Sequence, residues 1–67
     1  MKLNRKAVKV AMAERELNQK ELADLAGLEK TTLSCVLTGK SSGRPETWNK
    51  IAKALGVSVL DIVIIED

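Results

Sequence analysis

The stretch Gln19–Gly39, QKELADLAGLEKTTLSCVLTG, decides the fold of this 67-residue chain. In its first half, apolar residues recur at the i, i+3, i+4 spacing of a helix that buries one face, and they are Leu22, Leu25 and Ala26. Gly27 follows at once. A glycine ends a helix well because it takes the left-handed conformation at little steric cost. The pattern therefore predicts a short helix that stops at Gly27.

The second half of the stretch repeats the same spacing and predicts a second helix. Its apolar stripe is Leu33, Val36 and Leu37. Asn18 lies just before the helix that stops at Gly27, and Glu21 stands three residues after Asn18, a pattern close to a capping box. The chain should thus fold here into two short helices with a glycine turn between them.

Ala23 lies four residues before Gly27, and its small side chain would let the second helix cross close to the first. Two short helices that cross at a steep angle form the helix-turn-helix, whose second helix fits the major groove of DNA. The sequence therefore predicts this module.

The stretch also resembles the lambda-repressor-like DNA-binding domains, the Cro/cI or Xre family. The residues that carry the resemblance are a glutamine, an alanine, a glycine and two apolar residues at fixed spacing, here Gln19, Ala23, Gly27, Leu33 and Val36. It continues through GK at 39–40, RP at 44–45 and IAKALGVS at 51–58, so that it spans roughly Val8 to Val63. The resemblance implies an all-α bundle of about five short helices.

Length and composition restrict the class of protein. Residues 1–67 suffice for one small domain, whose stability should be modest. Cys35 is the only cysteine and there is no histidine, so we expect no internal disulfide, no metal and no cofactor. We find no signal peptide and no apolar run long enough to span a bilayer. A reduced, cytoplasmic setting fits these features.

The net charge of +2 is small, but its distribution is uneven. Up to Arg44 the chain has nine basic and five acidic residues, and after it two basic and four acidic residues. A basic first part suits a protein that turns one face toward phosphates. Ordinary solvated charge is the alternative.

The remaining helices follow from the same spacing rule. A first helix should run from about Asn4 to Glu16, with its buried residues at Val8, Ala11 and Met12 and with Leu17 closing it against the core. Pro45 suits the first turn of a fourth helix, which should end at Gly56. Its buried face would be Trp48, Ile51, Ala52 and Leu55.

Ser58 can cap a short fifth helix in which Leu60 and Val63 face inward. The end of the chain contains the strand-forming residues Val63, Ile64 and Ile65, so this segment could be either a helix or a strand. These residues are more apolar than a free terminus needs, so residues 58–67 are also a candidate dimerisation element. The predicted interface is Leu60, Val63, Ile64 and Ile65, and the alternative is that Ile64 and Ile65 fold back onto their own core.

The resemblance implies base contacts from the first turns of the second motif helix. The residues that would point away from Leu33 and Val36 are Lys30, Thr31, Ser34 and Cys35. A lysine can donate to guanine, and a threonine can give a hydroxyl or meet a thymine methyl. Glu29 departs from the serine or threonine that usually caps this helix in the family. Lys30 could instead be a solvated lysine, slightly unfavourable with the helix dipole.

Phosphate contacts are expected from Gln19, whose backbone N–H lies at a helix N-terminus. The other candidates lie at and after the end of the second motif helix, and they are Thr38, Lys40, Ser42 and Arg44.

Another departure from the family concerns the core, because many relatives pair an arginine with a glutamate where this chain has Met12 and Leu37. Replacing both charges by apolar residues is often neutral or stabilising, so we predict that Met12 and Leu37 touch.

The leading hypothesis is a sequence-specific regulator that binds double-stranded DNA as a homodimer on a two-fold operator, most simply a repressor. The alternatives are an antitoxin or a protein-interaction module on the same fold. An enzyme is disfavoured, because nothing evident in the sequence would activate Cys35 as a nucleophile.

Overall fold

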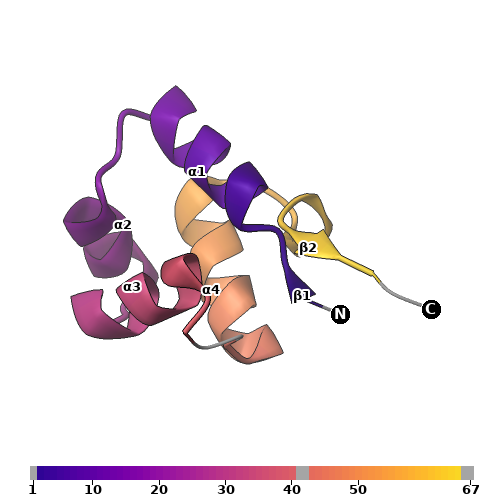
Figure 1. The fold of residues 1–67 in the computed structure, drawn as a ribbon. Helices are drawn as coiled ribbons and strands as arrows, with labels where there is room; N and C mark the ends of the chain where they lie inside the picture. Colours follow the sequence, from indigo (N-terminus) through magenta and orange to yellow (C-terminus); the bar gives the residue numbers. More distant parts are fainter. Residues whose placement is uncertain (1, 41–42, 66–67) are drawn as a thin grey trace.

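The computed structural model describes residues 2–40 and 43–65. Within these residues the chain forms four α-helices, α1 (Arg5–Glu14), α2 (Gln19–Ala26), α3 (Lys30–Thr38) and α4 (Pro45–Leu55). They are followed by one turn of 3-10 helix, η1 (Val59–Asp61), and framed by two short strands, β1 (Lys2–Leu3) and β2 (Val63–Ile64). The helices pack around one core, and the strand pair lies on the opposite side of the molecule from α2 (Figure 1).

The ends of α2 and α4 and the start of α1 lie where the local chemistry predicts. The side chain of Asn4 accepts a hydrogen bond from the Ala7 N–H at 3.2 Å and so caps α1. Pro45 opens α4, and Gly56 ends it in the left-handed conformation. α1 is shorter than expected, because its C-cap is Arg15 and Glu16 takes a positive φ of 55° that breaks the helical path before Leu17.

The core is built from residues of all four helices and the C-terminal segment. Its fully buried side chains are Val8, Leu22, Leu33, Ile51, Leu55 and Ile62. The predicted faces of α3 and α4 are confirmed, because every residue expected to be inside is buried there. Val8 and Met12 are buried in α1, while Ala11 and Leu17 are half-buried against the core.

The predicted stripe of α2 is wrong in one position. Leu25 is 62% exposed, whereas Ala23, which the spacing rule had not placed in the stripe, is 2% exposed. α2 packs against both α3 and α4, so its buried face is centred on Leu22 and Ala23 and turns Leu25 to solvent. The small Ala23 sits at this crossing, as the close approach of two helices requires.

The expected fifth helix is the single turn η1, and its inward residues differ from the prediction. Leu60 is 65% exposed and Val63 is half-buried, while Ile62 is 1% exposed. A 3-10 helix has three residues per turn, so Val59 and Ile62 share the inner face. The cap itself is as expected, because the Ser58 hydroxyl accepts from the Leu60 N–H at 3.3 Å and the Asp61 side chain accepts from the Ser58 N–H at 3.2 Å.

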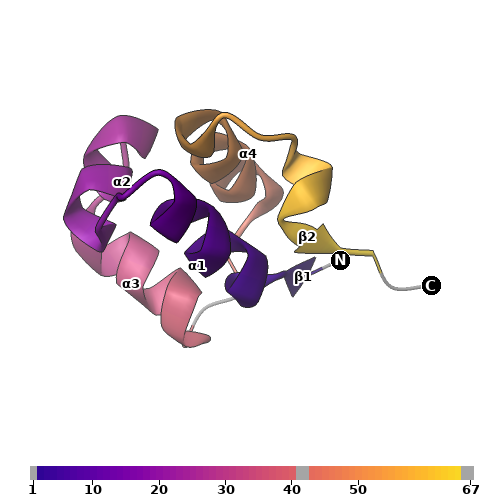
Figure 2. The ribbon, with the colours of Figure 1, turned by 90° about the horizontal axis from the view of Figure 1, so that it is seen from above.

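Residues after η1 form a strand, which answers the question that the sequence left open. β2 pairs antiparallel with β1, with Lys2 opposite Ile64 and Leu3 opposite Val63. The Asn4 N–H also donates to the Ile62 carbonyl at 2.7 Å. The start and the end of the chain are thereby joined, and the view from above shows β1 and β2 side by side beyond α1 (Figure 2).

Candidate DNA-binding surface

The turn between α2 and α3 is held by the backbone around Gly27. Gly27 has φ 70° and ψ 30°, and its N–H donates to the carbonyls of Ala23 and Asp24. The Leu28 N–H also donates to the Ala23 carbonyl, at 2.9 Å. This left-handed glycine ends α2, and the half-buried Leu28 anchors the following residue against the core. The glycine elbow predicted from the sequence is therefore present.

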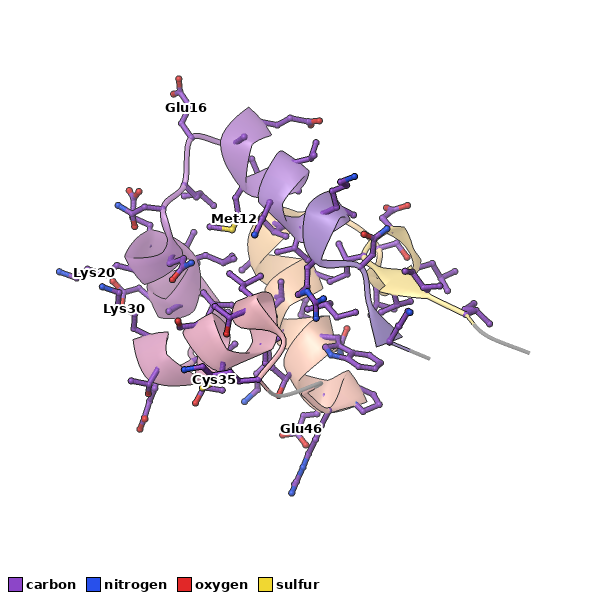
Figure 3. All side chains as sticks on the ribbon, viewed as in Figure 1. Met12, Glu16, Lys20, Lys30, Cys35 and Glu46 are labelled. Atoms are coloured by element: carbon purple, nitrogen blue, oxygen red, sulfur yellow. The ribbon has the colours of Figure 1, made fainter. Side chains whose placement is uncertain are left out.

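The elbow directs the first turns of α3 outward. Leu33, Val36 and Leu37 are 0%, 3% and 2% exposed and hold one side of the helix against the core. Lys30 and Thr31 are exposed on the helix, in agreement with the sequence prediction. Figure 3 shows the Lys30 side chain extending away from the body of the molecule.

The other two candidate reading residues are less open. Ser34 and Cys35 are half-buried, and in Figure 3 Cys35 lies at the outer edge of α3. Glu29 is the N-cap of α3 and makes no hydrogen bond through its side chain to the helix. The departure from a serine or threonine cap therefore has a structural consequence, since the N–H groups of the first turn of α3 keep no side-chain acceptor at the cap.

A hollow beside α3 brings candidate base-reading and phosphate residues together. We call it the reading hollow; it has a volume of about 400 Å³ and is lined by Thr31, Thr32, Cys35, Val36, Gly43, Arg44 and Thr47. Thr31 and Cys35 come from α3, and Arg44 comes from the N-cap of α4. An arginine in this position could neutralise a phosphate if α3 lies against DNA. Thr47 was not anticipated, because nothing in its sequence spacing marks it.

The N-terminus of α2 is a candidate site for a phosphate. The Asn18 side chain accepts from the Glu21 N–H at 2.8 Å, and the Glu21 side chain accepts from the Asn18 N–H at 3.0 Å. This exchange does not use the N–H groups of Gln19 and Lys20, which lie in the same first turn. Backbone N–H groups at such a position, together with the helix dipole, favour a phosphate.

Lys20 adds a charge to this end of α2 that the sequence prediction missed. It is exposed, and in Figure 3 its side chain extends toward the same edge of the view as that of Lys30. The signal that could have found it is its place in the turn directly after the Asn18 cap.

The remaining phosphate candidates are less uniform. Lys40 is exposed, as is Arg44. Thr38 is exposed too, but its hydroxyl donates to the Ser34 carbonyl at 2.8 Å and so already has an acceptor within α3. Ser42 lies outside the described residues. Lys40 and Arg44 therefore carry the structural case for this end of the surface.

Two further properties of the described residues bear on the class of protein. None of their helices combines the length and apolarity that a membrane crossing needs. Their His, Cys, Asp and Glu side chains nowhere gather in a group of three or more that could hold a metal ion.

Comparison with known proteins places the chain in a family. Among curated proteins, none matches it. A family model described as the Cro/C1-type HTH DNA-binding domain matches residues 7–67, which is nearly the whole chain. The matched region includes α2, the Gly27 elbow and α3. The protein therefore belongs to the Cro/C1-type helix-turn-helix DNA-binding domain family.

Proposed function

We propose that this DNA-binding protein is a transcription repressor that binds a two-fold symmetric operator as a homodimer. The observation that carries the proposal is the exposed start of α3, where Lys30 and Thr31 stand free of the core beside a hollow that contains Arg44. Lys30 can donate to guanine O6 and N7, and Thr31 can meet a thymine methyl. A repressor of this size would act by covering a promoter, in the cytoplasm.

Phosphate contacts would fix α3 in the groove. The N-terminus of α2, with Gln19 and Lys20, would hold one strand, and Lys40 and Arg44 would hold the backbone at the far end of the reading helix. If a dimer makes about eight such contacts, log affinity should fall against log salt with a slope near −7.

The proposed dimer forms through the C-terminal element, residues 58–67. Leu60 and Ile65 are 65% and 64% exposed, and Ile64 is 39% exposed. Next to Leu60 lies an open hollow of about 370 Å³ lined by Pro45, Glu46, Trp48, Asn49, Val59, Leu60 and Val63. Apolar side chains exposed beside an apolar hollow favour association, and a two-fold dimer would place its two reading helices about 34 Å apart, one turn of DNA.

Selection of bound fragments from random double-stranded DNA, followed by sequencing, tests the proposal. A two-fold symmetric consensus is the expected result, and the variant K30A/T31A should lose preference at defined base pairs while keeping binding to unrelated DNA. K50A/K53A is the matched control, because both lysines are exposed on α4. Absence of any selected sequence would contradict the proposal and favour a protein-interaction module or an antitoxin.

Sedimentation tests the dimer separately. Leu60→Glu should convert the protein to a monomer at tens of micromolar and weaken operator binding, whereas Leu25→Glu should leave the dimer intact. The control is matched because Leu25 is 62% exposed and lies on α2, outside the C-terminal element. A wild-type protein that stays monomeric with and without operator DNA would refute the dimer.

A further inference from the structure

A second hollow, which we call the α1 groove, lies between the start of α1 and the end of α3. It has a volume of about 640 Å³ and is lined by Lys2, Leu3, Asn4, Arg5, Lys6, Lys9, Val36, Gly39 and Ile64. Four of these described residues are cations and none is acidic. Such a groove presents concentrated positive charge next to the C-terminal end of α3.

The charges at the start of α1 are unfavourable for the helix on its own. The first turn contains no acidic residue, although the helix dipole favours anions there and disfavours Arg5 and Lys6. Arg5 and Lys9 are also like charges at i, i+4, which destabilises a helix by a few tenths of a kcal/mol. An anionic partner outside the chain would turn both features into stabilising ones.

Arg5 connects this groove to the reading helix. A Cβ at Gly39, the left-handed C-cap of α3, would lie 2.7 Å from Nη1 of Arg5, so the guanidinium rests against the end of α3. Val36 lines both the α1 groove and the reading hollow. The beginning of α1 and the end of α3 lie side by side in both views (Figures 1 and 2). The α1 groove therefore borders the C-terminal end of the helix that is proposed to read DNA.

We propose that the α1 groove is a second contact with the DNA backbone, in which Arg5 and Lys9 bind phosphates that flank the site read by α3. The proposal rests on the proposed function and adds partner contacts to it. Lys6 also borders another hollow that contains Glu14 and Asp61, so the contact is assigned to Arg5 and Lys9. Phosphate contacts position a protein without reading sequence, hence the groove would raise affinity for operator and unrelated DNA alike.

The experiment measures binding of R5Q/K9Q to operator and to unrelated DNA over a range of salt concentrations. If each residue neutralises one phosphate, the slope of log affinity against log salt should become less steep by about 1.8 per subunit. Affinity for both DNAs should fall by the same factor. K50Q/K53Q removes the same charge from exposed positions of α4 and should change the slope much less. Equal slopes for the two variants would overturn the proposal, because net charge alone would then explain the effect.

Ethylation of single phosphates locates the contact. Wild-type protein should show interference at phosphates outside those affected by K40Q/R44Q, and R5Q/K9Q should lose interference at those outer positions alone. K9Q by itself keeps Arg5 against Gly39 and should make the slope less steep by about 0.9 per subunit. This variant separates the loss of a phosphate contact from a loosened end of α3. If wild-type protein binds no DNA, the proposed function is refuted. If wild-type protein binds DNA and R5Q/K9Q keeps the full slope, only the proposed contact in the α1 groove is refuted.

Discussion

Asn18 and Glu21 cap α2 reciprocally, with N···O distances of 2.8 Å and 3.0 Å between each side chain and the other residue's backbone N–H. α3, the helix that follows, has no such cap, because the Glu29 side chain makes no hydrogen bond to it. The two helices of the motif thus differ in how firmly their first turns are held, although both begin at the surface proposed to meet DNA.

Asn18→Ala should lower the free energy of unfolding by about 1 kcal/mol, because a lost N-cap side chain leaves a helix N–H without its acceptor. For a domain of this size that corresponds to roughly 4–8 °C in Tm. Glu29→Ala is the control and should cost clearly less, since no cap bond is lost. Thermal unfolding followed by circular dichroism measures both, and equal losses would contradict the assigned roles of the two caps.

Gly43→Ala should destabilise the protein more than Gly27→Ala. Both glycines have nearly the same φ, 72° and 70°, so each substitution carries the same backbone strain, about 1–2 kcal/mol. A Cβ at Gly27 would meet nothing within 4 Å, whereas one at Gly43 would lie 3.0 Å from Trp48 Nε1 and 3.2 Å from Val36 Cγ2. Those two side chains are buried and cannot move aside freely.

The excess cost at Gly43 should therefore be steric, on the order of 1–3 kcal/mol as for an overpacked core. Denaturant unfolding gives the two free energies. Trp48 is the only aromatic residue in the chain, so its fluorescence reports on the same site: the emission of native Gly43→Ala should shift while that of Gly27→Ala should not. A larger loss at Gly27 would show that the loop before α4 yields to the added methyl.

The sequence was sufficient to predict the elements whose ends are set by local chemistry. The Asn18 cap, the Gly27 and Gly56 stops and the Pro45 start depend on one or two residues each, and all are confirmed. The face of α3 was predictable because its stripe meets the core at one regular spacing.

The sequence predictions were wrong where tertiary packing decides which residues are buried. Leu25 fits a helical stripe, but α2 is clamped by both α3 and α4 and buries Ala23 instead. Leu60 was expected inside, but a 3-10 turn changes the period from 3.6 to three residues. The strand β1 pairs with β2 from the other end of the chain, and pairing over that separation leaves no local signal. The α1 groove likewise needs Arg5 and Gly39 to be brought together by the fold.

Met12→Arg should destabilise the protein strongly, and Met12→Arg combined with Leu37→Glu should recover much of the loss. Met12 is 8% and Leu37 2% exposed, and both belong to the same core cluster. A lone buried charge costs several kcal/mol, while a charge paired with a partner costs far less. For 67 residues the total stability is of order 3–10 kcal/mol, so the single variant should be largely unfolded at ambient temperature.

A double-mutant cycle on these positions measures the coupling, with Leu37→Glu as the second single variant. Direct contact between Met12 and Leu37 remains a prediction, and a favourable interaction free energy in the cycle is its expected sign. Additive losses would mean that the two side chains occupy the core without touching.

DNA should protect Cys35 from thiol reagents. Cys35 is half-buried and lines the reading hollow with Thr31 and Arg44, so a duplex seated against α3 would cover the hollow and keep a bulky alkylating reagent from the sulfur. Operator DNA should slow the reaction several-fold, and protein alkylated beforehand should lose operator binding while staying folded. Because the chain has no other cysteine, the rate belongs to this residue alone. A control moves the thiol to an exposed position of α4 with C35S/K50C, whose alkylation should proceed at the same rate with and without DNA. If operator DNA left the rate at Cys35 unchanged while binding tightly, α3 would not be the helix that lies in the groove.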